Sequence, residues 1–257
     1  MVWDTPSYDA QNRPVTQTTP DSSVTRTSYD EGGALQAVEV DVRGATPAVD
    51  IVTDITYDAR GRRLGIDYGN GTATAYTYDA LSQRLTKLVT TRSSDSTTLQ
   101  DLRYFYDAVG NIVELQDHAQ QTTFFANTQV DPHATYTYDA LYRLVGATGR
   151  EKVSLAQAVQ SDPTYGVVPD PGTTVLRTYT RSYAYDEVGN ITQMAQSGDW
   201  TRTYTYASGS NRLLSNSAPG GGTHSYTYSD RGAMTAMPHL DTMTRDWRDQ
   251  LRWHGPS

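Results

Sequence analysis

Tyrosines alternate with small or polar residues along much of this chain, and an aspartate repeatedly ends the alternation. The clearest example is Arg103-Tyr-Phe-Tyr-Asp-Ala-Val-Gly-Asn-Ile112, where two tyrosines stand two positions apart before an Asp and a Gly-Asn pair. Residues i and i+2 of a strand point to the same face, and Tyr and Thr favour a half-buried, pleated surface. Each phrase therefore predicts a strand with two tyrosines side by side. The phrase recurs as Tyr76-Thr-Tyr78-Asp79, Tyr136-Thr-Tyr138-Asp139 and Tyr183-Ala-Tyr185-Asp186, with weaker copies at Tyr8-Asp9, Tyr29-Asp30, Tyr57-Asp58, Tyr204-Thr-Tyr206 and Tyr226-Thr-Tyr228.

The aspartate after each tyrosine pair predicts a turn. An Asp carboxylate can accept hydrogen bonds from backbone N–H groups two residues further on, and a following Gly supplies a positive φ at little cost. A short apolar stretch comes next, as in Asn190-Ile-Thr-Gln-Met194. Each repeat is therefore predicted to be a hairpin of strand, Asp-Gly turn and strand. Asn70-Gly71 separately predicts a two-residue hairpin loop.

The spacing of the second tyrosines points to a repeat architecture. They fall at positions 8, 29, 57, 78, 106, 138, 185, 206 and 228, so that the steps are 21, 28, 21, 28, 32, 47, 21 and 22 residues. A step of about 21 residues lies in the range that marks solenoids and arrays. We predict an all-β array of antiparallel hairpins over residues 1–257, with a long loop insertion at 146–178 and a terminal segment at 231–257.

The insertion has its own composition. Residues 151–160 predict a short helix, because Val153, Ala156 and Val159 fall near one face. The Pro/Gly-rich stretch 162–172 predicts a long loop. The simplest interpretation of the insertion is an exposed, variable surface loop.

Three longer phrases carry a resemblance to a known family: residues 99–112, residues 136–145 with 147–151, and residues 236–240 leading to 247–251. They resemble the YD (RHS) repeat of bacterial Rhs polymorphic toxins, of the B and C components of insecticidal toxin complexes, and of teneurins. The chain is most similar to the B components and their SpvB-like relatives, and the resemblance covers nearly its whole length.

This resemblance implies a fold and a function. Repeats of this family form one long β-sheet that spirals into a hollow shell, which encloses a toxic C-terminal domain. The chain would be a wall segment of such a shell. The implied partners are the remainder of the shell, the enclosed toxic domain and other components of a toxin complex.

Composition narrows the alternatives. A net charge of −8 argues against nucleic acid and against an anionic membrane surface. The 19 tyrosines against 3 phenylalanines and the low hydrophobic share of 37% favour a thin sheet over a thick core. Without cysteines there is no disulfide framework or thiolate zinc site. Residues 1–20 contain no apolar core of a cleavable signal peptide. If the protein is secreted or extracellular as part of a larger toxin, another route carries it.

No residue pattern predicts catalysis, a cofactor or a metal. The five histidines, at positions 118, 133, 224, 239 and 254, lack metal-ligand spacing. The aspartates come once per repeat and are not clustered as in a calcium loop. The resemblance implies a self-cleaving aspartate in Asp-Pro-x-Gly phrases. Asp170-Pro171-Gly172 and Asp162-Pro163 match this only in part and lie inside the array, so we expect no self-cleavage here and no enzyme activity.

A second hypothesis is binding. Rows of exposed tyrosines could stack on the sugar rings of a cell-surface glycan, provided that their ring faces are open to solvent. The chain also ends at Ser257 without a closing repeat, and solenoids need capped ends. We therefore expect it to be a piece of a longer polypeptide.

Overall fold

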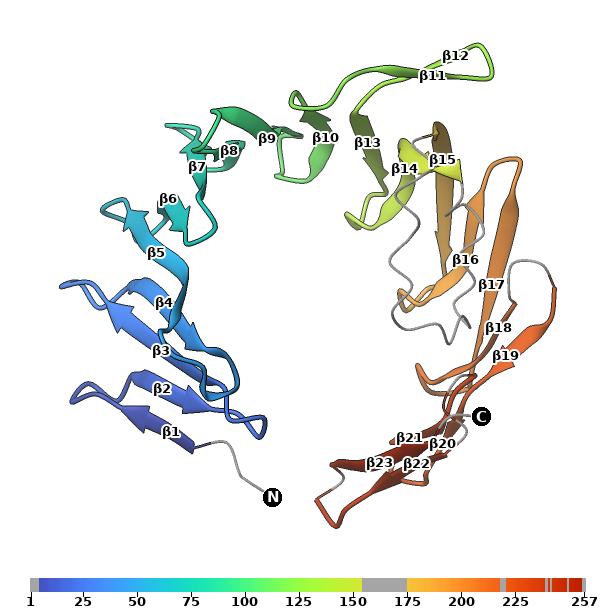
Figure 1. Cartoon of the computed structure of the whole chain (residues 1–257). Coiled ribbons are helices and arrows are strands. Elements are labelled where there is room, and N and C mark those ends of the chain that lie inside the picture. The colour runs from blue at the N-terminus through green and yellow to red at the C-terminus, as the bar shows by residue number, and fades with distance from the viewer. Residues whose placement is uncertain are drawn as a thin grey trace. The chain divides into compact units, whose positions relative to one another are not determined.

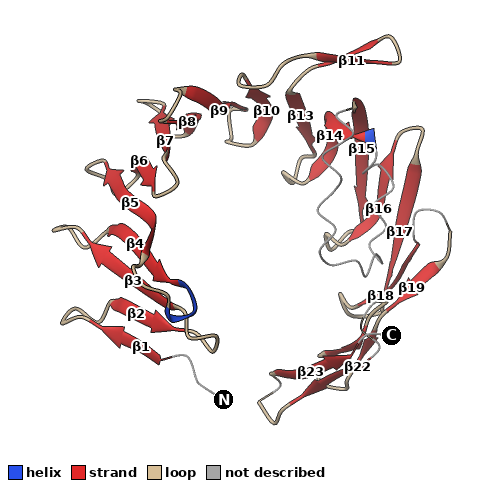
Figure 2. Ribbon diagram, viewed as in Figure 1, coloured by secondary structure: helices blue, strands red, loops and turns tan. Residues whose placement is uncertain are grey.

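A computed structural model of the chain describes residues 5–153, 175–217, 221–238, 240, 242–248 and 250–255. It is built almost wholly of strands (Figure 2), and a short 3-10 turn, η1 (Val42–Gly44), connects β4 to β5. The strands are β1 (Thr5–Tyr8), β2 (Pro14–Thr18), β3 (Val24–Tyr29), β4 (Leu35–Asp41), β5 (Val49–Tyr57), β6 (Arg63–Tyr68), β7 (Thr72–Tyr78), β8 (Leu85–Arg92), β9 (Thr97–Tyr106), β10 (Ile112–Asp117), β11 (Thr123–Phe125), β12 (Thr128–Val130), β13 (His133–Tyr138), β14 (Leu144–Lys152), β15 (Leu176–Tyr185), β16 (Ile191–Gln196), β17 (Trp200–Tyr206), β18 (Leu213–Ser217), β19 (Thr223–Ser225), β20 (Thr227–Tyr228), β21 (Met234–Ala236), β22 (Thr242–Arg245) and β23 (Leu251–Gly255). Among the described residues, no helix has the length and apolar character needed to cross a bilayer.

The strands fall into two compact units. The first holds Met1–Phe105 and Leu115–Gln120, and the second holds Tyr106–Glu114 and Gln121–Ser257. In the first unit β1 to β9 pair in chain order, each antiparallel to the next (Figure 1). In the second unit β13 to β19 do the same. Strands β1 to β9 of the first unit and β13 to β19 of the second thus each form a continuous antiparallel sheet. The predicted all-β hairpin array is confirmed.

The alternation of residues sets the two faces of the sheet. In β13 and β15 the tyrosines are half-buried while the alternate Thr, Ser and Ala residues are exposed. This is the same-face placement of Tyr136 with Tyr138 and of Tyr183 with Tyr185 that period-two alternation predicts. One face therefore carries the aromatic rings and the other carries small, mostly polar side chains.

The core is thin, as the composition predicts. Among the described residues, the buried hydrophobic side chains include Ile55, Ile66 and Met243, and only Val130 and Asn216 are buried almost completely. Most apolar area comes from half-buried tyrosines. The hydroxyl of a half-buried tyrosine needs a hydrogen-bond partner, so hydrogen bonds between repeats matter more here than close packing.

The insertion between repeats differs from the prediction. Strand β14 runs to Lys152 and β15 begins at Leu176, so the interruption is shorter than 146–178. The expected helix was wrong at its start, because Glu151 and Lys152 pair with Arg177 and Leu176 across the two strands. Gly149 permits this pairing, since a Cβ there would lie 2.7 Å from the Tyr179 hydroxyl. The rest of that helix and the Pro/Gly stretch 162–172 lie outside the described residues.

Two further expectations need correction. The loop between β6 and β7 holds three residues, Gly69 to Gly71, instead of two. Only Gly71 has a positive φ, at 77°, whereas the predicted two-residue loop needs positive φ at both positions. The terminal segment 231–257 also continues the hairpin pattern, because β22 and β23 pair around a turn that starts at Asp246.

Candidate functional site: the junctions between repeats

Most repeats turn on their own aspartate, whereas the turns after Tyr206 and Tyr228 begin at Ala207 and Ser229. The Oδ1 atom of Asp58 accepts the backbone N–H groups of Arg60 at 2.9 Å and Arg62 at 3.0 Å, and its Oδ2 atom accepts the Nε of Arg62 at 2.7 Å. The predicted Asp turn is thus confirmed, with an added contact to the residue four positions on. The same Oδ1 bonds recur at Asp9, Asp139, Asp186 and Asp246, and Asp107 and Asp186 bind an Asn at that fourth position.

Eight of the second tyrosines follow a break in strand register. In β15 the register shifts between Ala184 and Tyr185, and in β13 it shifts between Thr137 and Tyr138. Such a shift, or β-bulge, re-aims the side chain that follows it. The bulge recurs before Tyr8, Tyr29, Tyr57, Tyr78, Tyr206 and Tyr228.

The re-aimed phenol bonds to the preceding repeat. The Tyr185 hydroxyl donates to the carbonyl of Leu144 at 2.7 Å, and Leu144 is the first residue of the strand after the previous Asp turn. Every such bond reaches the same place in the earlier repeat. The remaining pairs are Tyr29 to Pro14, Tyr57 to Leu35, Tyr78 to Arg63, Tyr138 to Ile112, Tyr206 to Ile191 and Tyr228 to Leu213, at 2.7–3.0 Å.

Arginines reinforce several of these junctions. The guanidinium of Arg143 binds Asp139 in its own turn and lies 4.7 Å from the ring centre of Tyr185 in the next repeat. A cation placed over an aromatic face is attracted by the ring quadrupole. Arg13 over Tyr29 and Arg62 over Tyr78 repeat the arrangement at 4.3 Å. An Asp, an Arg and a Tyr from two successive repeats therefore form one junction.

One junction escaped the sequence analysis because its tyrosine is replaced. Arg245 precedes Asp246, follows a bulge, and donates through Nη2 to the carbonyl of Met234 at 3.3 Å. Met234 opens the strand after the preceding turn, so Arg245 occupies the place of the second tyrosine. The signal that could have found it is an Asp followed five residues later by Leu251 at the start of a strand.

The tyrosine rings are not laid out as a binding platform. Both members of every Tyr-x-Tyr pair are half-buried, apart from Tyr226, which is 9% exposed and donates to Asn216 at 2.7 Å. A sugar-stacking surface needs ring faces in solvent. The binding alternative is therefore not favoured.

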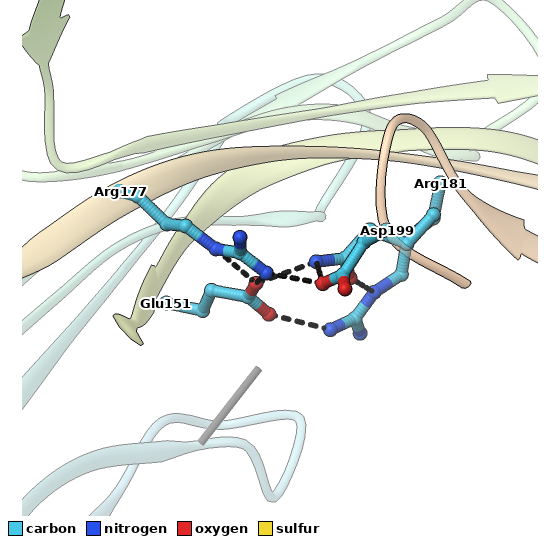
Figure 3. A network of polar contacts seen from close by, with 5 residues as sticks. Glu151, Arg177, Arg181 and Asp199 are labelled. Carbon is cyan, nitrogen blue, oxygen red and sulfur yellow. Dashed lines mark hydrogen bonds and ion pairs between the residues drawn. The ribbon is translucent and has the colours of Figure 1, made fainter. Parts of the chain in front are cut away.

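A second polar cluster ties three strands and a turn together. Glu151 on β14 accepts hydrogen bonds from Arg177 and Arg181 on β15 and from Gln196 at the end of β16, at 2.6–3.0 Å (Figure 3). Gln196 and Arg177 also bind Asp199 in the following turn. The Glu151 side chain is only 12% exposed, so its charge depends on these donors.

We expect Glu151→Ala to lower the free energy of unfolding by about 2 kcal/mol. Removing one partner of a buried ion pair costs about 3–5 kcal/mol, and the partly exposed arginines reduce that cost through solvent screening. Urea unfolding measures the change. Glu187→Ala, which alters an exposed turn residue, serves as the control. Equal midpoints for the two variants would show that the cluster does not hold the strands together.

The turn aspartates and the tyrosines make stability depend on pH in opposite directions. The backbone N–H of Arg62 holds the pKa of Asp58 below its usual range, and the Thr19 hydroxyl lowers the pKa of Asp21 to about 2. A carboxyl whose pKa is lower in the folded chain than in the unfolded chain stabilises the fold at pH values above its unfolded pKa of about 3.9. This stabilisation is lost as the pH falls through the lowered pKa. Burial raises the pKa of Tyr138, Tyr185 and Tyr206. The neutral phenols therefore stabilise the fold below about pH 10, and their contribution is lost as the pH rises above about 10.

The denaturant midpoint should therefore stay level between about pH 5 and 9, fall below about pH 4.5, and fall again above about pH 10. Chemical denaturation followed by circular dichroism across this range tests the expectation. Asp58→Asn should reduce the fall of the midpoint at acidic pH and leave its fall at alkaline pH unchanged. A midpoint that changes smoothly through pH 7 would contradict the assignment, because none of these groups titrates there.

The described histidine side chains are those of His118, His133 and the half-buried His224, and none of them takes part in the tyrosine junctions. His118 and His133 are exposed, and the side chains of His239 and His254 lie outside the described residues, as do Asp162 and Asp170. Among the described residues no three His, Cys, Asp or Glu side chains gather in a way that could hold a metal ion. The absence of catalytic, cofactor and metal residues stays a prediction.

The geometry defines a class of protein: a β-sheet array in which hairpins are hydrogen-bonded to their predecessors, seven of them through a tyrosine and one through an arginine. The family that matches is the RHS repeat, over residues 8–46. The chain belongs to the RHS-repeat proteins.

Two curated relatives are toxin subunits of Yersinia entomophaga. YenC1 is 35% identical over 215 residues, which cover 80% of this chain and 22% of the relative. YenC2 is 38% identical over 197 residues, which cover 73% and 20%. The chain thus spans about a fifth of the length of these relatives. Neither relative is named as a B component. The expectation that the chain is most similar to B components therefore stays a prediction.

Solved structures agree with the fold. The Tc holotoxin pore of Photorhabdus luminescens, with a TccC3 mutation, matches 97% of this chain and 12% of its own, with a TM-score of 0.73 and 30% identity. The TcdB2-TccC3 complex without its hypervariable C-terminal region matches 96% and 12%, with a TM-score of 0.70 and 31% identity. The chain is an RHS-repeat segment that resembles insecticidal toxin-complex components.

Proposed function

We propose that this segment is a structural part of the wall of an RHS-repeat shell that encloses a toxic C-terminal domain in a secreted toxin. The observation that supports it most is the serial junction. Seven tyrosine hydroxyls reach the same backbone position of the preceding repeat. A chain held in this way can extend as a continuous sheet for as many repeats as the polypeptide supplies.

The segment's role in this proposal is mechanical. Closed sheets avoid the exposed strand edges that cause aggregation, and each junction fixes the register between hairpins that a thin core could not fix by packing. The tyrosine hydroxyls and turn carboxylates are engaged in structure, which leaves no acid–base pair among them for catalysis. The partners are the rest of the shell, the enclosed domain and further toxin-complex components, and the toxin acts outside the cell that makes it.

Protection of the downstream region tests the proposal. The natural polypeptide that contains this segment is digested with a broad-specificity protease, and peptides from its C-terminal region are followed by mass spectrometry. We expect that region to be cut at least tenfold more slowly in the native protein than after denaturation. Cleavage at the same rate in both states would reject enclosure.

A pair of variants links protection to the junctions. Tyr185→Ala, which removes a phenol bonded to Leu144, should speed cleavage of the downstream region. Tyr142→Phe, at a position 60% exposed in a turn, should leave the rate unchanged. Equal rates for the two variants would separate enclosure from the tyrosine junctions.

A further inference from the structure

The junction at Tyr206 departs from the repeat at two positions. At three other junctions the residue four positions after the turn aspartate is an arginine. Its guanidinium binds that aspartate and lies 4.3–4.7 Å from the ring centre of the next second tyrosine; the three sets are Asp9, Arg13 and Tyr29, Asp58, Arg62 and Tyr78, and Asp139, Arg143 and Tyr185. In the β15–β16 turn that position holds Asn190, and the turn after Tyr206 begins with Ala207 instead of an aspartate.

Asn190 binds its own turn but is too short to take the arginine's place over the ring. Its Nδ2 atom donates to Oδ2 of Asp186 at 2.8 Å and to Oδ1 of Asn211 at 3.2 Å. An asparagine side chain ends there, whereas the longer Arg143 side chain extends from Asp139 to the Tyr185 ring. Ala207 brings no carboxylate of its own, so both changes leave space beside Tyr206.

A groove of about 770 Å³ lies at this junction, within the roughly 300–1,000 Å³ that is usual for ligand pockets. Its lining belongs to the second unit and includes Asp186, Asn190, Tyr204, Tyr206, Ala207 and Asn211. Asp186, Asn190 and Tyr206 are the equivalents of Asp139, Arg143 and Tyr185. The groove therefore lies where an arginine side chain lies in the preceding repeat.

The acceptors that hold the internal arginine have counterparts in the groove. Arg143 donates through Nε to Oδ2 of Asp139 at 2.7 Å, and through Nη1 to the backbone carbonyl of Asp186 at 3.2 Å. The counterparts are Oδ2 of Asp186 and the backbone carbonyl of Ala207, and both residues line the groove. Since each carboxylate oxygen has two lone pairs, the bond from Asn190 leaves Oδ2 of Asp186 able to accept a second donor.

The electrostatics of the groove favour a cation. Burial raises the pKa of Tyr185 and of Tyr206. The charge of Arg143 opposes this rise at Tyr185, whereas the Asp186 carboxylate adds to it at Tyr206. A cation over Tyr206 would be attracted both by that carboxylate and by the face of the ring. Such a contact needs one open ring face and not the row of exposed rings that sugar stacking requires.

We propose that the groove at the Tyr206 junction binds a guanidinium group, which lies over the Tyr206 ring and donates hydrogen bonds to Asp186 and to the Ala207 carbonyl. A planar guanidinium can stack on a ring and donate in several directions within its plane, which an ammonium group cannot do. The group comes from an arginine side chain outside this segment or from a free guanidinium compound. This inference does not depend on the wall function.

Saturation-transfer NMR on the natural polypeptide tests the groove, with N-acetyl-arginine amide as the probe. Where the groove is open, we expect the probe's side-chain protons to be saturated at least fivefold more strongly than those of N-acetyl-lysine amide. Asn190→Arg supplies the residue found at the other junctions and should reduce the probe signal at least tenfold. Gln193→Arg adds the same charge at an exposed position outside the groove and should retain the signal. Equal, measurable signals in these two variants would overturn the proposal.

Two substitutions at Tyr206 separate its ring from its hydroxyl. Tyr206→Phe loses the bond to the Ile191 carbonyl but keeps the ring face, and it should retain the probe signal within about twofold. Tyr206→Leu removes the ring and should lower the signal at least fivefold. Equal signals from the two folded variants would mean that the ring does not hold the cation, and the proposal would fail. If circular dichroism shows that Tyr206→Leu is unfolded, the comparison of Asn190→Arg with Gln193→Arg decides.

A cross-link identifies the source of the guanidinium. Benzoyl-phenylalanine replaces Val188, an exposed residue of the groove, in the natural polypeptide. If the ligand is a free compound, the probe binds the unmodified protein and no peptide is linked. If it is an arginine side chain, the probe gives no signal, one defined stretch is linked, and changing the arginine of that stretch to glutamine lets the probe bind. Neither probe binding nor such a link, or a stronger NMR signal from cellotetraose than from the probe, would overturn the proposal.

Discussion

Replacing Gly69 with alanine is expected to lower the free energy of unfolding of the first unit by about 3 kcal/mol or more. A Cβ at this position would lie 1.8 Å from the backbone oxygen of Asp50 and 2.5 Å from its carbonyl carbon. The obstacle is backbone and cannot move aside as a flexible side chain can. Gly69 also donates its N–H to Ile51 at 3.2 Å, so relieving the clash would break a bond between β5 and the β6–β7 loop. Overpacking of this kind costs about 1–3 kcal/mol, and more where the backbone must shift.

Gly71→Asn is the matched control for this variant. Gly71 lies in the same loop with a φ of 77°, and no heavy atom lies within 4 Å of an added Cβ. Asparagine tolerates that conformation better than other residues with a Cβ. Urea unfolding should show a large loss for Gly69→Ala and a change within about 1 kcal/mol for Gly71→Asn. A similar loss in both would mean that the loop is intolerant for a reason other than the close approach to Asp50.

Tyr185→Ala is expected to destabilise the second unit by about 3 kcal/mol. The variant removes a half-buried ring. Truncation of a fully buried aromatic side chain lowers the free energy of unfolding by about 3–5 kcal/mol, and a half-buried ring should account for a large part of that loss. It also removes the bond to Leu144 at 2.7 Å and the surface on which Arg143 rests at 4.7 Å. Tyr185→Phe keeps the ring and should cost about 1 kcal/mol, the net value of one hydrogen bond.

The difference between these two variants separates the phenol from the ring. Tyr142→Phe, at an exposed position, should be neutral. Native-state hydrogen exchange should place the effect of Tyr185→Phe on the amides of β14, β15 and β16. If Tyr185→Phe were neutral as well, the hydroxyl would not contribute to the junction and ring packing alone would hold successive repeats together.

The parts of the fold that depend on local chemistry could be predicted from the sequence. Alternation places Tyr136 and Tyr138 on one face of β13, and Asp58 closes its turn through its own carboxylate. Both results depend only on residues a few positions apart, and the period of a strand and the geometry of an Asp turn are the same in any protein.

The junctions could not be predicted in this way because they depend on register between strands. The bulge before Tyr185 and the bond to Leu144, 41 residues earlier, exist only once β14, β15 and β16 are aligned. Arg245 was missed for a different reason, since an arginine stands there in place of the tyrosine that marks the other junctions. The extent of β14 was missed because a glycine such as Gly149 is typical of a loop. Its place inside a strand is explained only by the Tyr179 side chain that lies against it.

An electron cryo-microscopy map of the natural polypeptide, purified with an antibody against this segment, tests the central claim most directly. The account predicts that β1 to β19 lie in the wall of a hollow shell, with Tyr185 bonded to Leu144 and density for a further stretch of polypeptide inside. A map in which both faces of this sheet are open to solvent, with no enclosed volume, would contradict it.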